Sequence, residues 1–176
     1  AQDLDALLGR MPAQSPSDGD ACSQELLAMG PDAVASLAAQ LVPMGAGDDL
    51  AQRYLLSGFA KYVSRGLAED ARIMSAQALL KAIDGAGEKE VKAFLIRQLQ
   101  LFGGAECLEP LAALLGDPVL YEPAAQALTA IDAPGTGVAL LDALAVAEGP
   151  AEIRFVKALG ELRYAPAIVE ISVYAW

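Results

Sequence analysis

The chain has 176 residues, of which 23 are acidic, 12 are basic and none is histidine. This length can bury a core without disulfides or a metal, and one continuous domain is the expected organisation. The net charge of −11 repels phosphate backbones and anionic lipid headgroups, so nucleic acid and membrane surfaces are excluded as partners. The charge serves either to keep an apolar-rich chain soluble or to attract a partner with a basic surface. The absence of histidine removes the commonest general base and metal ligand.

Hydrophobic residues make up 55% of the chain and aromatic residues only 6%. A composition rich in alanine and leucine favours closely packed helices. Cys22 and Cys107 lie far apart without a CxxC partner and are interpreted as small core residues. No apolar run approaches the roughly 20 residues that cross a bilayer, so no membrane insertion is expected. The chain begins Ala1-Gln2, as after signal-peptidase cleavage, which favours a periplasmic or secreted location over the cytoplasmic alternative.

The first segment, residues 3–11, has Leu4, Leu7 and Leu8 at the spacing of a short amphipathic helix. Residues 12–19 contain two prolines and several turn formers, which predicts a break. Residues 1–20 are therefore interpreted as an N-terminal helical cap or arm.

From residue 21 onward, apolar residues recur at helical spacing between glycine and proline turns. The clearest stripe begins after residue 48 and predicts one buried face, which comprises Ala51, Tyr54, Leu55, Gly58, Phe59, Tyr62 and Val63. No strand is required, although residues 168–173 alternate partly. Helices are expected over residues 21–29, 32–42, 48–63, 69–83, 88–102, 106–115, 119–131, 138–146, 150–162 and 165–176.

Three segments share one pattern, an apolar helix followed by a tight turn and a second apolar helix. Their first helices end at Phe102, Ile131 and Leu162, a period of about 30 residues that indicates stacked helical hairpins. The turns GGAECLEPLAALLGD, DAPGTGVALLDAL and MGPDAVASLAAQLVP resemble those of the HEAT-like family of bacterial repeat proteins, over residues 20–176. In such an array, Gly58 and Gly160 are expected to let neighbouring helices approach closely.

The resemblance implies an all-α fold, a right-handed α-α superhelix or armadillo-type solenoid of about five antiparallel helix pairs. Residues 21–176 are assigned to this array, with pairs at about 21–43, 48–84, 88–116, 118–147 and 150–176. The resemblance also implies a concave surface that holds another protein.

Acidic pairs begin several of the expected helices, where a carboxylate stabilises the positive helix end. They are Asp48/Asp49, Glu69/Asp70 and Glu88/Glu90. The glycine runs lack the lysine of a phosphate loop, and no calcium-loop pattern is present. The sequence therefore predicts no catalytic, cofactor-binding or metal-ligating residue, and no cofactor.

The leading hypothesis is a noncatalytic protein-interaction scaffold with an acidic binding face on the second helices, formed by Glu106, Glu109, Asp142 and Glu170. A structural or assembly segment of a larger repeat protein or oligomer is the alternative. That alternative includes self-association through the apolar C-terminal end, which carries Ile171, Val173, Tyr174 and Trp176. An enzyme that relies on carboxylates alone is the third and least favoured hypothesis.

Overall fold

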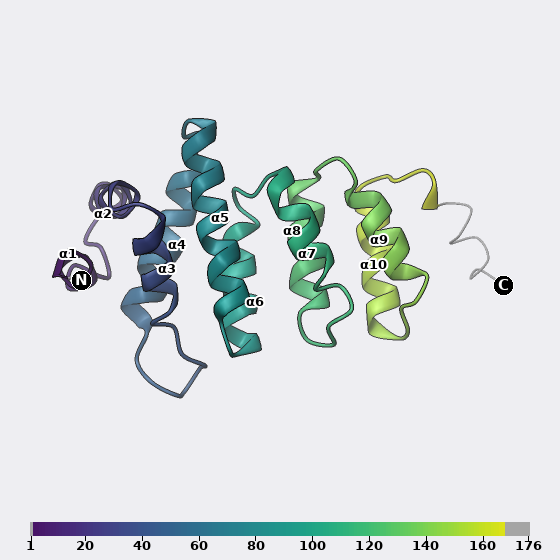
Figure 1. The fold of residues 1–176 in the computed structure, drawn as a ribbon, viewed down its shortest axis with the longest axis horizontal. Coiled ribbons are helices and arrows are strands. Elements are labelled where there is room, and N and C mark those ends of the chain that lie inside the picture. Colours follow the sequence, from purple (N-terminus) through teal and green to yellow (C-terminus); the bar gives the residue numbers. More distant parts are fainter. Residues whose placement is uncertain (1, 168–176) are drawn as a thin grey trace. The chain divides into compact units, whose positions relative to one another are not determined.

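The computed structural model describes residues 2–167, and the regular secondary structure of this part of the chain is entirely helical (Figure 1). It contains ten α-helices and one short 3-10 helix, which confirms the all-α prediction for the described residues. The chain divides into two compact units, Ala1–Gly103 and Gly104–Trp176. The partly alternating residues 168–173 lie outside the described range, as do the apolar C-terminal residues and most of the final expected helix.

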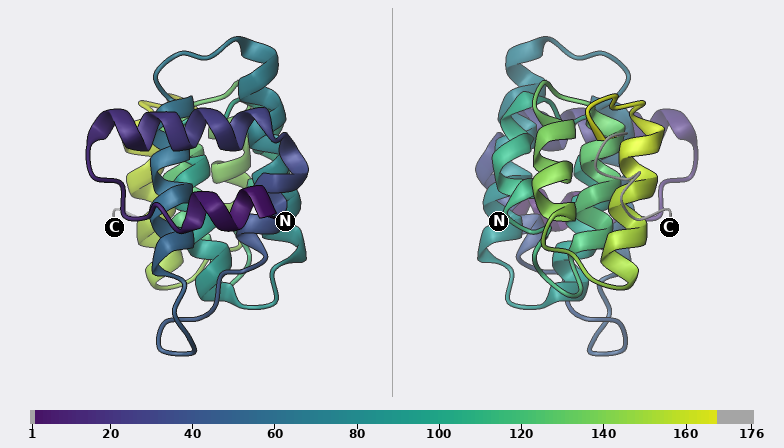
Figure 2. Two further views of the ribbon diagram at one scale, coloured as in Figure 1. Left: turned by 90° about the vertical axis from the view of Figure 1, so that its left-hand side faces the viewer. Right: turned by 90° about the vertical axis from the view of Figure 1, so that its right-hand side faces the viewer.

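The first unit contains six helices. They are α1 (Gln2–Leu8), α2 (Pro16–Ala28), α3 (Pro31–Ala38), α4 (Leu50–Val63), α5 (Glu69–Gly85) and α6 (Lys89–Leu99). Helix α2 packs on α4, and α3 packs on α5. Helices α1 and α2 run crosswise to α4 and α5 (Figure 2). The core of this unit is built from fully buried leucines and Phe59 of α4.

Helix α2 begins earlier than the sequence indicated. Its first residue is Pro16 and its N-cap is Ser15, whose Oγ accepts a hydrogen bond from the Asp18 N–H at 3.2 Å. Proline fits the first turn of a helix because the N–H that it lacks has no partner there in any case. Residues 16–20 were assigned to the arm but are helical, and the break is confined to the segment before Ser15.

The second unit contains the remaining helices. They are η1 (Ala105–Cys107), α7 (Leu108–Ala112), α8 (Tyr121–Ile131), α9 (Thr136–Leu144) and α10 (Pro150–Glu161). Helix α10 contacts both α8 and α9. Its Phe155 is buried and meets the Tyr121 ring edge-on, with the ring centroids 6.1 Å apart.

The helix expected over residues 88–102 and the helix expected over 106–115 fall in different units. The first is α6, and the second is replaced by η1 and the five-residue α7. Helices corresponding to the pairs 21–43, 48–84 and 118–147 are all present. Among the described helices, none combines the length and the apolar character needed to cross a membrane.

Two glycines of the second unit occupy opposite environments. A Cβ atom built on Gly137 of α9 would overlap the ring of Tyr164, whereas one built on Gly160 of α10 would have nothing within 4 Å. The expectation that Gly160 permits close helix packing is therefore wrong, whereas Gly137 permits the close approach of the Tyr164 ring, which follows α10, to α9.

This contrast predicts opposite stability effects for the two alanine variants. Gly137→Ala should lower the free energy of unfolding by about 1–3 kcal/mol, because the Tyr164 ring must move. Gly160→Ala should raise it by about 0.5–1 kcal/mol, because alanine loses less backbone entropy in a helix. Urea unfolding followed by circular dichroism measures both, and destabilisation of equal size would contradict the packing described.

Candidate binding cleft

Of the four acidic residues predicted to form a binding face, the structure describes three, and two of these are exposed. Glu109 of α7 and Asp142 of α9 are exposed, and these two helices are in contact. Glu106 is half-buried, and its carboxylate accepts a hydrogen bond from the Gly104 N–H at 3.0 Å, which secures the turn before η1. Glu170 lies outside the described residues. The acidic face therefore remains a prediction, with two exposed members.

The paired carboxylates have structural contacts. Asp48 accepts a hydrogen bond from the Leu50 N–H at 3.2 Å, as expected for an acid that begins a helix. Glu69 pairs with Arg72 in the same helix at 2.7 Å. Over residues 2–167, no group of three or more acidic or cysteine side chains is arranged to hold a metal ion. Both cysteines are buried, as predicted, and burial raises the pKa of the Cys22 thiol.

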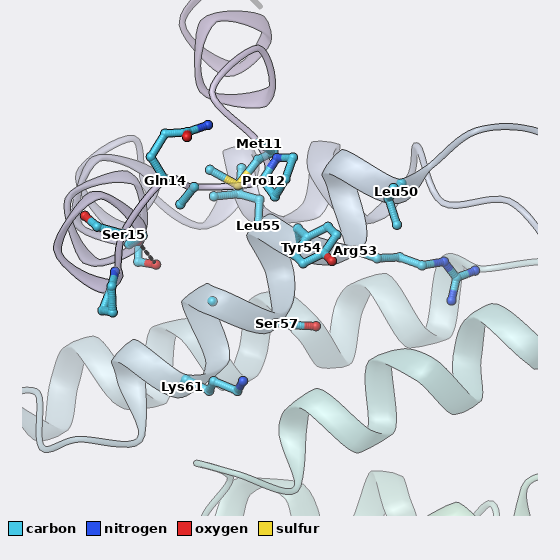
Figure 3. Close-up of a pocket in the computed structure, with 15 residues that line it drawn as sticks. Met11, Pro12, Gln14, Ser15, Leu50, Arg53, Tyr54, Leu55, Ser57 and Lys61 are labelled. Atoms are coloured by element: carbon cyan, nitrogen blue, oxygen red, sulfur yellow. Dashed lines mark hydrogen bonds between the residues drawn. The ribbon is translucent and has the colours of Figure 1, made fainter.

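A cleft of about 670 Å³ opens in the first unit between α4, the start of α2 and the segment that joins α1 to α2 (Figure 3). None of its lining residues is acidic. They are Met11, Pro12, Ala13, Gln14, Ser15, Pro16, Gly19, Ser23, Leu50, Arg53, Tyr54, Leu55, Ser57, Gly58 and Lys61. The cleft thus combines apolar walls with a few polar groups, the usual make-up of a binding site.

One stripe of α4 forms the long side of the cleft. Leu50, Tyr54, Ser57 and Lys61 follow one another at intervals of four, three and four residues, which places them on one face of the helix. The Leu50 and Tyr54 side chains are 58% and 50% exposed. The sequence placed Tyr54 in the core, and this assignment is wrong. The buried face of α4 includes Leu56 and is rotated away from the predicted face, so that Tyr54 lies at the edge of the buried face.

Small residues form the floor of the cleft, where α2 packs on α4. Ser23 of α2 is buried, and its hydroxyl donates a hydrogen bond to the Gly19 carbonyl at 2.8 Å. A Cβ atom built on Gly58 of α4 would lie 3.7 Å from the Ser23 Oγ, which is an ordinary contact. Glycine at position 58 is therefore not needed for helix packing, contrary to the expectation, and its missing side chain leaves the cleft open.

The two basic residues of the cleft differ in their partners. The Arg53 guanidinium pairs with Asp49 at 2.9 Å and with Glu90 at 3.2 Å, and it lies over the Phe94 ring, 4.7 Å from the centroid. Arg53 thereby ties α4 to α6. In the part of the chain that the structure describes, the Lys61 ammonium has no carboxylate within salt-bridge distance.

Asp49, buried at the start of α4, holds Arg53 in place. Its carboxylate accepts hydrogen bonds from the Arg53 guanidinium and from the Val42 N–H at 3.0 Å. Burial by itself would raise the pKa of this carboxyl, but these hydrogen bonds outweigh burial and lower it. Because the pKa is lower in the folded than in the unfolded state, the stabilisation is present above about pH 4 and is lost as the pH falls through the folded-state pKa.

Asp49→Asn is therefore expected to lower the free energy of unfolding by about 1–3 kcal/mol at pH 7. The difference between wild type and variant should shrink as the pH falls below about 4, because the Asp49 carboxyl is then protonated in the unfolded wild type and, at still lower pH, in the folded wild type as well. Urea unfolding at pH 7 and pH 3 measures both effects. Asp48→Asn, at the exposed neighbouring position, is the matched control and should change stability by less than about 0.5 kcal/mol. A difference that is the same at both pH values would exclude an ionic role for Asp49.

Sequence reasoning missed the cleft, although one signal for it is present in the sequence. The residues at positions 50, 54, 57 and 61 recur at helical spacing and none of them is acidic, but Tyr54 was assigned to the core stripe, so the four were not recognised as one face. No protein-family model matches the chain, and no curated protein matches it significantly.

Proposed function

We propose that the chain is a noncatalytic protein-interaction module and that its α4 cleft binds an extended peptide segment of a partner protein. The observation that carries this proposal is the pair of exposed apolar side chains, Leu50 and Tyr54, at the edge of an open cleft. A contiguous apolar surface beside a concavity is typical of binding sites, and tyrosine is enriched among residues that dominate binding energy.

The length of the cleft favours a peptide. Leu50 and Lys61 are eleven helical residues apart, which corresponds to about 16 Å along the axis of α4. An extended peptide advances about 3.3 Å per residue, so roughly five residues would span this distance. The polar atoms of Ser57 and Gln14, which also line the cleft, are suited to hydrogen bonds with a peptide backbone.

We further propose that the helices are stacked hairpins of the HEAT-like type. Contacts within each unit support this proposal. In the first unit α3 packs on α5, and in the second α8 packs on α10 and α7 on α9. In stacked hairpins, first helices contact first helices and second helices contact second helices, as in these three contacts. Exposed Glu109 and Asp142 favour a second candidate surface, an acidic face for a basic partner.

Selection of a random nine-residue peptide library, displayed on phage, against the immobilised chain tests the cleft. We expect enriched peptides with a large apolar residue. Tyr54→Ala should weaken their binding, measured by fluorescence polarisation, by about tenfold or more. The matched control is Val146→Ala, which removes an apolar side chain that is 84% exposed and outside the cleft. If no peptide is enriched, or if Tyr54→Ala leaves the affinities unchanged, the proposed function is wrong.

A further inference from the structure

The α4 cleft is free of acidic residues in a chain that carries 23 of them against 12 basic ones. Arg53 and Lys61 are the charged residues that line it. The charge of Arg53 is already balanced by Asp49 and Glu90. Lys61 is therefore the group that gives the cleft a positive charge available to a ligand.

The position of Lys61 in the last turn of α4 has a simpler structural explanation, which is stabilisation of the helix C-terminus. That terminus already has other partners. The Lys61 carbonyl accepts hydrogen bonds from the Ser64 hydroxyl at 2.9 Å and from the Arg65 Nε at 3.3 Å. Arg65, in turn, pairs with Asp20 of α2. Since neighbouring side chains cap the helix end, the Lys61 ammonium is not needed there and is available to pair with a ligand in the cleft.

The distance between Lys61 and the apolar part of the cleft determines how far apart the charged and apolar groups of a ligand must be. Tyr54 and Lys61 are seven residues apart, so they lie on the same face of α4, separated by about 10 Å along the helix axis. Figure 3 shows their side chains along the same helix, with Ser57 between them. About three residues of extended peptide cover this distance.

We propose that the peptide bound in the cleft places an apolar or aromatic side chain against Tyr54 and, about three residues away, an aspartate or glutamate that pairs with Lys61. This inference rests on the proposed peptide-binding function and adds the chemical class of the ligand. Charge complementarity supports this inference, because a carboxylate bound in the cleft would lie near the unpaired ammonium of Lys61 and near no acidic lining residue.

The experiment is a charge-swap selection with the same random nine-residue library. Wild type should enrich peptides in which an acidic residue lies about three positions from a large apolar one. Lys61→Glu should enrich lysine or arginine at that position instead. Lys81→Glu is the matched control, because Lys81 is an exposed lysine of α5 outside this cleft and its reversal changes the net charge equally. The control should select the same peptides as wild type.

Affinity measurements with individual selected peptides then test the pairing between the acidic residue of the peptide and Lys61. Replacing the acidic residue of a selected peptide by glutamine should weaken binding to wild type by about three- to tenfold, and binding to Lys61→Gln by less than about twofold. Equal losses on both chains would overturn the inference. So would enrichment of the same motif by wild type and Lys61→Glu, or enrichment of segments of this chain's own sequence without an acid, which would assign the cleft to a second copy.

The same data separate failure of the inference from failure of the proposed function. If no peptide is selected, the peptide-binding function itself is wrong. If the selected peptides are purely apolar and depend on Tyr54 but not on Lys61, the function stands and the carboxylate preference is wrong.

Discussion

Phe155→Ala is expected to lower the free energy of unfolding by about 3–5 kcal/mol, the largest stability effect that we predict. The Phe155 side chain is 1% exposed and lies on the buried face of α10, which packs on both α8 and α9. Removal of the ring loses its buried apolar area and its edge-on contact with Tyr121. It also leaves a cavity that the surrounding helices can fill only in part.

Chemical denaturation followed by circular dichroism gives the change in unfolding free energy. Ile153→Ala is the matched control, because Ile153 lies in the same helix but is 72% exposed. It should change stability by less than about 0.5 kcal/mol. If the two variants were destabilised equally, the orientation of α10 described here would be wrong.

Gly58→Met is expected to reduce peptide binding by at least about tenfold without unfolding the chain. The first carbon of the new side chain would lie 3.7 Å from the Ser23 Oγ, which is an ordinary contact. Because Gly58 lines the cleft, we expect the rest of the side chain to occupy cleft space. Methionine is also a better helix former than glycine, so the melting temperature should be maintained or raised.

Fluorescence polarisation with a selected peptide measures this loss. Gly160→Met is the matched control, because Gly160 is an exposed glycine inside α10 with open space around it. That variant should bind as wild type does. Retained affinity in Gly58→Met would show that the peptide binds elsewhere on the chain.

The helices were largely predictable from local patterns. Gly85 ends α5, and Pro150 begins α10, as the glycine and proline signals indicated. The start of α2 was not predicted, because a Ser-Pro-Ser-Asp sequence reads as a turn unless Pro16 is recognised as the first residue of a capped helix. The exposure of Tyr54 was also missed, since periodicity identifies a buried stripe but not the neighbouring helices that decide where its edge lies.

The cleft could not be predicted because its two sides come from distant parts of the sequence. Met11 and Pro12 meet α4 only in the folded unit. Arg53 and Lys61 look alike in the sequence, as basic residues of one helix. The structure distinguishes them, because Glu90, which balances Arg53, belongs to α6 and is 37 residues away. Long-range ion pairs of this kind leave no local signal.

The most direct test of the central claim, that the α4 cleft is the binding site, is an NMR titration of the ¹⁵N-labelled chain with a selected peptide. Shift changes should be confined to the amides of residues 11–16, 19–23 and 50–61. Changes centred on Glu109 of α7 and Asp142 of α9, with the residues of the cleft unaffected, would contradict the claim and would favour the acidic face instead.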